Sequence, residues 1–268
     1  MNEIFGFIGC GNMGGALAGA VAKSEMPKSL LLCDACAEKA ETLARTLGAE
    51  AATPNEVAAK ATYIFLGVKP QGFEGLFETI RPILKARTDP FVLVSMAAGI
   101  SIAAVEQLAA CKPAVIRIMP NMAASVGKGM ILCASNAATT EEQMAAFMQA
   151  MEPSGILDTI PEDKIDAASA LSGCGPAFVY LFAEALADGA VECGLPRDKA
   201  MLYAAQTLSG AAEMLLKTGK HPGELKDAVC SPGGTTIAGV HALESGAFRA
   251  STMEAVTAAY ERTLELKK

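Results

Sequence analysis

The chain has 268 residues, 51% of them hydrophobic and 19% charged, and its formal net charge is −7 at pH 7. The acidic balance and the lack of a Lys/Arg cluster argue against nucleic acid and anionic membranes as partners, so a small-molecule substrate is expected. The length allows two domains, and the apolar content exceeds what a small monomer needs, so we expect an obligate oligomer.

The N-terminus opens with an apolar run, residues 4–8, and shows no signal peptide, which predicts a cytoplasmic protein. The run ends in a GxGxxG motif that precedes a helix-compatible segment. There the first glycine forms a tight turn, the second lets backbone N–H groups approach a pyrophosphate, and the third allows close packing. The motif predicts dinucleotide binding by Ile8, Gly9, Cys10, Gly11, Asn12, Met13 and Gly14.

A second apolar run, residues 30–33, ends at Asp34. A carboxylate at this point accepts hydrogen bonds from the adenosine ribose and repels a 2′-phosphate, which favours NADH. Asp34 is also a candidate N-cap for a helix expected over residues 35–47, and Lys39 and Arg45 on that helix leave NADPH open. The sequence therefore predicts NADH or NADPH as the cofactor without deciding between them.

Eight cysteines are spread along the chain, and Cys33 and Cys36 form a CxxC pair. A zinc site needs a second ligand pair, which His221 and His241 do not supply at a matching spacing. Scattered cysteines in a reducing compartment are usually small buried hydrophobes, so no metal site is expected.

Short apolar runs alternate with amphipathic segments through the first part of the chain. The expected strands are residues 4–8, 30–33, 63–66, 91–95, 115–119, 130–134 and 156–160. This alternation is typical of an α/β fold with a doubly wound parallel sheet. From Asp163 onward the segments are long, rich in Ala, Leu and Met, and helical. We expect a dinucleotide-binding domain over residues 1–160 and an all-helical domain over residues 161–268 that dimerises through its helices.

Three of the expected strands end in unusual sequences, and ligands of such sheets lie beyond the carboxyl ends of the strands. The end of the expected strand 63–66 predicts cofactor contacts from Val68, Lys69 and Pro70, and the end of the strand 91–95 predicts contacts from Ala97, Ala98 and Gly99. Asn121 follows the third of these strands, residues 115–119, and could orient the substrate. The alternatives are a solvated loop lysine at Lys69 and turn chemistry at Asn121.

Two glycine-rich turns precede helical patterns in the second half, residues 172–177 (SGCGPA) and 231–236 (SPGGTT). Helix N-termini present unsatisfied N–H groups and a positive dipole end, so together the turns could hold a substrate carboxylate without an arginine. Capping by Ser or Thr is the alternative, and explains two glycines before two threonines less well. The uncharged stretch at the first turn, residues 167–183, is too short and too broken to predict a transmembrane segment.

Several longer motifs resemble the pyrroline-5-carboxylate reductase family in order and spacing, over essentially the whole chain: GFIGCGNMG, GVKPQ, SMAAGIS, RIMPN, LSGCGPAF, HPGELKDAVCSPGGTTIAG and LESGAFR. The resemblance implies a Rossmann-type domain followed by an all-helical domain that interlocks into dimers, often assembled into decamers. It also implies NAD(P)H-dependent reduction of L-1-pyrroline-5-carboxylate to L-proline, the last step of proline biosynthesis.

The resemblance also assigns roles to residues. Thr236 would be catalytic, because its hydroxyl would hydrogen-bond the ring nitrogen of the substrate. Asn55 would contact the adenosine portion of the cofactor, and members that favour NADPH carry Ser, Thr or Asn-Arg where this chain has Cys33 and Asp34. With Asn121 and Thr236, the substrate-binding residues would be Gly175, Pro176, Ser231, Gly234 and Thr235.

Two other functions are compatible with part of the pattern. A β-hydroxyacid dehydrogenase also joins a Rossmann domain to a helical one, but it needs a catalytic lysine on the interdomain helix, and no lysine follows Ser172 before Lys199. A dinucleotide-binding scaffold without turnover would tolerate loss of the SPGGTT segment, which this chain keeps.

Overall fold

The computed structural model describes residues 3–265, which divide into two compact units. The first unit contains the chain up to Gly173 and the end of the last helix from Arg262. The second unit is Cys174–Glu261.

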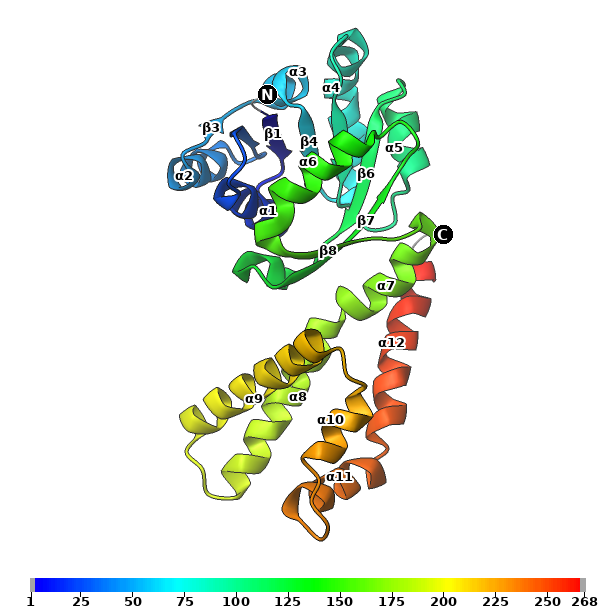
Figure 1. The fold of residues 1–268 in the computed structure, drawn as a ribbon. Coiled ribbons are helices and arrows are strands. Elements are labelled where there is room, and N and C mark those ends of the chain that lie inside the picture. Colours follow the sequence, from blue (N-terminus) through cyan, green and yellow to red (C-terminus); the bar gives the residue numbers. More distant parts are fainter. Residues whose placement is uncertain (1–2, 266–268) are drawn as a thin grey trace. The chain divides into compact units, whose positions relative to one another are not determined.

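The first unit is built around an eight-stranded sheet (Figure 1). Across the sheet the strands follow the order β3-β2-β1-β4-β5-β6-β7-β8, so the order reverses between β1 and β4. In such sheets the reversal marks where ligands bind. The strands are β1 Glu3–Ile8, β2 Lys28–Cys33, β3 Glu50–Ala51, β4 Tyr63–Leu66, β5 Val92–Ser95, β6 Ala114–Met119, β7 Gly129–Ser135 and β8 Gly155–Thr159.

Helices cover both faces of this sheet, which therefore carries two apolar layers. Helices α1, α2 and α6 pack on one face, and α3, α4, α5 and α7 contribute to the other. Because both faces are buried, the strands are continuous apolar runs in the sequence. The helices are α1 Asn12–Lys23, α2 Ala37–Leu47, α3 Pro54–Lys60, α4 Phe73–Ala86, α5 Ile102–Ala109, α6 Glu141–Met151 and α7 Ile165–Ser172.

The expected α/β fold is confirmed, but the sheet differs from the prediction in the direction of its last strands and in one strand that was not predicted. Strands β1 to β6 are parallel, but β7 pairs antiparallel with β6, and β8 runs parallel to β7. The chain joins β6 to β7 through residues 120–128 alone, which is shorter than the crossover that a parallel neighbour needs. The edge strand β3 is two residues long, too short to give a periodic signal.

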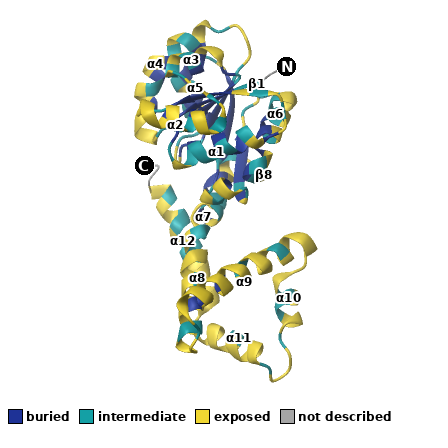
Figure 2. Ribbon diagram, turned by 90° about the vertical axis from the view of Figure 1, so that its left-hand side faces the viewer, coloured by how far each residue is buried: buried dark blue, intermediate teal, exposed yellow. Residues whose placement is uncertain are grey.

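The second unit consists of helices with a very small core of its own. Helices α8 and α9 pack through Ala187, Ala200 and Ala204. Of the 20 exposed large hydrophobic residues in the described part of the chain, 15 lie in this unit, and most of the unit is drawn as exposed in Figure 2. A surface of this kind needs a partner. Its helices are α8 Gly175–Glu192, α9 Arg197–Thr218, α10 Pro222–Ala228, α11 Thr235–Ser245 and α12 Phe248–Glu265, whose end belongs to the first unit.

The junction of α7 and α8 differs from the expected glycine-rich turn. Gly173 and Cys174, the two residues between the helices, both have right-handed helical dihedral angles. The helical stretch Glu162–Glu192 is therefore long and apolar enough to cross a membrane, which corrects the expectation that it is too short and broken. A single stretch of this kind is weak support for a membrane span, and the exposed face of a subunit interface gives the same pattern.

Candidate active site

The glycine-rich loop after β1 is shaped by close contacts between backbones. Gly9 has φ +106°, and a Cβ on it would lie 2.5 Å from the Gly67 carbonyl oxygen, so only glycine fits. A Cβ on Gly14 would collide with the Gly9 carbonyl oxygen, which explains the third glycine of the motif. The loop is tied to its neighbours by hydrogen bonds from Gly9 N to Cys33 O and from Gly67 N to Ile8 O, each 2.8 Å.

Gly11 differs from these two glycines, because no other atom packs against it and it faces open space. It is the N-cap of α1, makes no side-chain capping hydrogen bond, and has no neighbouring atom within 4 Å of an added Cβ. The backbone of Gly11 is therefore not covered by other atoms, and it lies directly before the backbone N–H groups of the first turn of α1. This is the arrangement in which a phosphate group can approach a helix N-terminus closely.

Asp34, directly after β2, is bound to the glycine-rich loop. Its Oδ2 accepts a hydrogen bond from Cys10 N at 2.8 Å, and its Oδ1 accepts one from Cys36 N at 3.0 Å. The N-cap of α2 is Cys36, so the interpretation of Asp34 as a helix cap was wrong. Burial, followed by the nearby Asp34 carboxylate, raises the pKa of the Cys10 thiol to about 11, so the thiol stays protonated at neutral pH.

A hollow of about 570 Å³ lies beside Asp34, between α1 and α2. The oppositely charged Glu38 and Lys39 both line it, together with Cys10, Gly15, Cys36, Thr42, Leu43 and Thr46. A ribose hydroxyl suits this mixed lining, whereas a 2′-phosphate would meet one favourable and one unfavourable charge.

The other predicted cofactor segments lie at the same edge of the sheet. Residues 68–70 follow β4, residues 97–99 follow β5, and the exposed Asn55 lies in the first turn of α3. Strands β2, β1, β4 and β5 are neighbours, so the structure brings these segments to the carboxyl ends beside the glycine-rich loop. Lys69 is exposed, which fits both a ligand contact and a solvated loop lysine. Their contacts with a cofactor stay predictions.

Asn121 follows β6 and has a structural task. Its Nδ2 donates to Ser172 O at 2.9 Å, and its Oδ1 accepts from Met130 N at 3.3 Å. The side chain thus ties the end of α7 and the start of β7 to the loop after β6. One N–H of the amide is left over for a substrate contact, which stays a prediction.

The SPGGTT segment runs into α11 and ends at the second residue of that helix. Gly234 is the N-cap and makes no side-chain capping hydrogen bond, so Thr235 and Thr236 occupy the first two helical positions. Capping by Ser or Thr, the alternative for this turn, is therefore wrong here. A Cβ on Gly234 would collide with the Ser231 side chain, and Gly233 has φ +69°, so each glycine has a steric reason.

One chain does not bring the two predicted substrate turns together. In Figures 1 and 2, α8 begins at the upper end of the helical unit and α11 lies at its lower end. The start of α8 and helix α11, which follow the two turns, are therefore separated within this unit. If both contact one substrate, they come from different copies.

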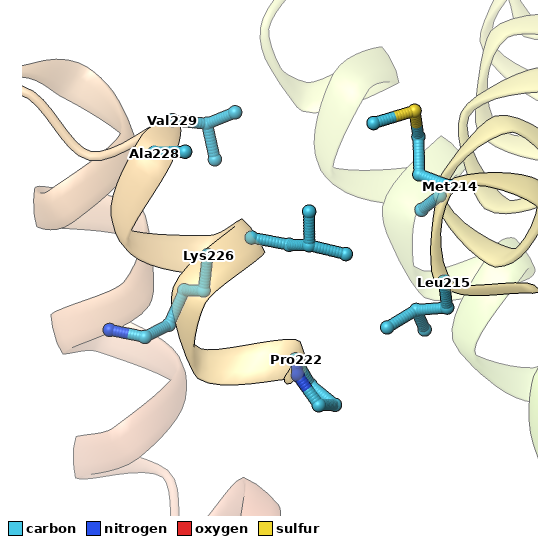
Figure 3. A pocket seen from close by; sticks show the side chains of 8 residues that line it. Met214, Leu215, Pro222, Lys226, Ala228 and Val229 are labelled. Atoms are coloured by element: carbon cyan, nitrogen blue, oxygen red, sulfur yellow. The ribbon is translucent and has the colours of Figure 1, made fainter. Parts of the chain in front are cut away.

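A separate hollow of about 390 Å³ lies between α9 and α10 (Figure 3). Met214 and Leu215 face Pro222 and Val229 across it, while the Lys226 side chain points away and its Nζ pairs with Asp227. The lining is apolar, so this hollow suits packing against another apolar surface and not a charged ring substrate. The remaining lining residues are Ala211, Leu225 and Ala228.

One buried charged group of the first unit was not predicted from the sequence. Arg117, on β6, is 3% exposed and pairs with Glu162 at 3.1 Å and with Asp166 at 3.3 Å. The signal was present in the sequence, because an arginine interrupts the apolar strand AVIRIM. In the described residues 3–265, no group of three or more His, Cys, Asp and Glu side chains could hold a metal ion.

Comparison with known proteins agrees with this arrangement. Residues 162–266 match the family described as pyrroline-5-carboxylate reductase dimerisation, and residues 4–99 match the family described as NADP oxidoreductase, coenzyme F420-dependent. Pyrroline-5-carboxylate reductase 3 of Danio rerio is 44% identical over 265 residues, which cover 97% of this chain and 90% of that protein.

Two solved structures are similar over the whole chain. A pyrroline-5-carboxylate reductase from Coxiella burnetii has a TM-score of 0.91 at 31% identity, with 100% of both chains covered. The Plasmodium falciparum pyrroline carboxylate reductase with NADP bound has a TM-score of 0.86 at 31% identity, covering 100% of this chain and 99% of that one. With a relative at 44% identity across nearly its whole length, the chain belongs to the pyrroline-5-carboxylate reductase family of NAD(P)H-dependent oxidoreductases.

Proposed function

We propose that this protein reduces L-1-pyrroline-5-carboxylate to L-proline with NADH or NADPH, the final step of proline biosynthesis. The observation that carries the proposal is the SPGGTT turn in a chain that matches a family member over 97% of its residues. Since Gly234 is the N-cap, the hydroxyl of Thr236 is not used as a helix cap and is exposed. It is therefore available to a ligand.

The residues of the first unit fit a dinucleotide. The open backbone at Gly11 and the N-terminus of α1 suit a pyrophosphate, and the carboxylate of Asp34 suits the adenosine ribose. Asn55, residues 68–70 and residues 97–99 would hold the remainder of the cofactor. When bound, NAD(P)H supplies the hydride.

The substrate needs little from the protein beyond orientation. It is a cyclic imine that is readily protonated near neutral pH, so no strong general acid is required. The ring N–H donates to the hydroxyl oxygen of Thr236, which fixes the face of the ring that is presented. Ser231 and the backbone of Gly234, Thr235 and Gly175 bind the carboxylate, next to Pro176. Positioning and backbone dipoles then supply most of the rate enhancement.

The complete site is assigned to a homodimer formed through the helical domain. The helical unit exposes its apolar residues, and within one chain the start of α8 is separated from α11. A second copy would cover the apolar face of Glu162–Glu192, so this stretch is not a membrane span. In this proposal residues 1–160 bind the cofactor, residues 161–268 bind substrate and dimerise, dimers assemble further into decamers, and the protein is cytoplasmic.

Initial rates with purified protein test this function against its rivals. We expect oxidation of NADH or NADPH with pyrroline-5-carboxylate, and no reduction of NAD⁺ or NADP⁺ with β-hydroxy acids, since α8 carries no lysine. Turnover of a β-hydroxy acid would favour the dehydrogenase. Cofactor binding without turnover of either substrate would favour the scaffold.

A further inference from the structure

The buried cluster around Arg117 links three parts of the first unit. Arg117 Nη1 donates to Glu162 Oε1 at 3.1 Å, and its Nη2 donates to Asp166 Oδ1 at 3.3 Å. The same Glu162 oxygen accepts from the backbone N of Ile102, at 2.8 Å. Arg117 lies on β6, Ile102 is the first residue of α5, and Asp166 is in the first turn of α7. One guanidinium group therefore holds the starts of two helices to one strand.

Arg117 is buried at 3% exposure, so stability alone does not explain the cluster. Its neighbours in register on β5 and β7 are Ser95, which is fully buried, and Ala134. The Arg117 Nε and the Ser95 Oγ are buried with no hydrogen-bond partner. Burying an ion pair involves a large desolvation penalty, and apolar residues of similar volume often stabilise a fold equally well. Such a cluster is better explained by the geometry that it imposes.

The two helix starts that the cluster holds adjoin the candidate active site. Helix α5 follows residues 97–99, the predicted cofactor segment after β5. Helix α7 is bound at both ends from β6 and its loop, because Arg117 holds Asp166 and Asn121 holds the carbonyl of Ser172. Three residues after Ser172 the chain reaches Gly175, a predicted substrate contact.

We propose that Arg117 is a positioning residue for hydride transfer. Through Glu162 it fixes the cofactor segment at residues 97–99, and through Asp166 it fixes the helix that leads into the substrate-binding turn. It touches neither cofactor nor substrate. Its loss would therefore misplace the two reacting partners while most binding contacts remain.

Arg87 provides a matched control. It is also a buried arginine, with 5% of its side chain exposed, and it pairs with Asp89. Its Nη1 donates to the carbonyls of Ala58 and Ala61, before the start of β4, so it lies at the amino ends of the strands. An Arg87→Met substitution thus breaks a comparable cluster at the edge remote from the candidate site.

The experiment compares Arg117→Met with Arg87→Met in the dimeric protein. We expect both to lower the Tm. Only Arg117→Met should lower kcat/KM for pyrroline-5-carboxylate, by about tenfold to 100-fold, while the dissociation constant for NADPH changes by less than about threefold. Arg117→Lys should recover part of the loss, because an ammonium group replaces only some of the contacts of the guanidinium fork.

The proposal is overturned if Arg117→Met lowers the Tm as Arg87→Met does and leaves kcat/KM within about twofold of the wild type. If Arg117→Met does not fold, Glu162→Ala decides, since this side chain is 31% exposed and its loss is milder. A fall in kcat/KM with an unchanged dissociation constant for NADPH then supports the proposal. Unchanged kcat/KM in Glu162→Ala overturns it.

Discussion

At the scale of single residues, Thr236 and Asp34 each allow a specific prediction. In the structure neither residue is the N-cap of a helix, so helix capping does not explain why either is present. Thr236 stands at the second position of α11, behind a glycine N-cap. Asp34 lies two residues before the N-cap of α2 and binds backbone N–H groups on both sides. Neither residue is the N-cap of its helix, so we expect substitutions at Thr236 to act on the substrate, and substitutions at Asp34 to act on the cofactor and on the loop that Asp34 binds.

Replacing Thr236 with alanine should lower turnover without loosening the fold. One oriented hydrogen bond in a closed site contributes about 2 to 4 kcal/mol, so kcat should fall by about 30-fold or more. The Tm and the affinity for NADPH should stay close to those of the wild type. Steady-state kinetics and thermal melting of one purified variant measure both quantities.

Thr257→Ala is the control for this change. Thr257 lies on α12 of the same helical unit, where its hydroxyl donates to Met253 O. It should leave kcat unchanged. Near-normal kcat in Thr236→Ala as well would remove Thr236 from the catalytic residues.

Replacing Asp34 with serine should shift cofactor preference towards NADPH, because a carboxylate repels the 2′-phosphate. We expect the wild type to use NADH at least as well as NADPH in kcat/KM. In Asp34→Ser the ratio of NADPH to NADH efficiency should rise by about tenfold, or about 1.4 kcal/mol. Asp34→Asn removes the charge and keeps one of the two hydrogen bonds, because its amide oxygen can still accept from Cys10 N while its NH2 group cannot accept from Cys36 N. An unchanged ratio in both variants would contradict the proposed role.

At the scale of elements, the turn between β1 and α1 contains two glycines with different tasks. Gly11 faces the expected ligand, and Gly14 is required for close packing of the backbone. Gly11 has an ordinary φ of −66° and open space around it, so Gly11→Ala should leave the Tm unchanged. The methyl group of the alanine would stand where a phosphate approaches, so NADPH should bind about tenfold more weakly.

Gly14→Ala should instead lower the Tm, because its Cβ collides with Gly9 O. Fluorescence titration and thermal melting check both, and unchanged affinity in Gly11→Ala would argue against phosphate binding at this turn.

Several elements could be predicted from the sequence because their signals are local. Apolar runs gave seven of the strands, and the spacing from the glycine motif to Asp34 placed the end of β2. The direction of β7 was not predictable from its composition, because apolar periodicity reports burial and not the sense of pairing. The length of the preceding connection was the usable signal.

The candidate site was predictable only where its residues form contiguous motifs. Arg117 was missed because its partners, Glu162 and Asp166, are 45 and 49 residues away in the sequence. The same limit applies to Asp34, whose bond to Cys10 N depends on two strands lying side by side. Contacts of this kind exist only once the sheet has formed.

At the scale of the whole molecule, the small core of the helical unit predicts that the working form has at least two copies. If the cofactor segments and Thr236 of one site come from different copies, two inactive variants should complement each other. Gly11→Val should lack cofactor binding and Thr236→Ala should lack turnover. A heterodimer carrying two affinity tags should recover about half of the wild-type activity, in one intact site.

Light scattering of the tandem-purified protein checks the assembly in the same experiment. A monodisperse monomer would contradict the dimer. A stable heterodimer without recovered activity would contradict a site shared between copies. Activity above that of both homodimers, which serve as controls, is the predicted result.

The function itself is best tested by following the transferred hydrogen. NADH that carries deuterium at the reactive face of C4 is mixed with pyrroline-5-carboxylate and the wild-type protein, and the product is analysed by mass spectrometry. We predict L-proline with one deuterium at ring carbon 5, formed in equal amount to the cofactor oxidised. Cofactor oxidation without labelled proline, or no oxidation with this substrate, would contradict it.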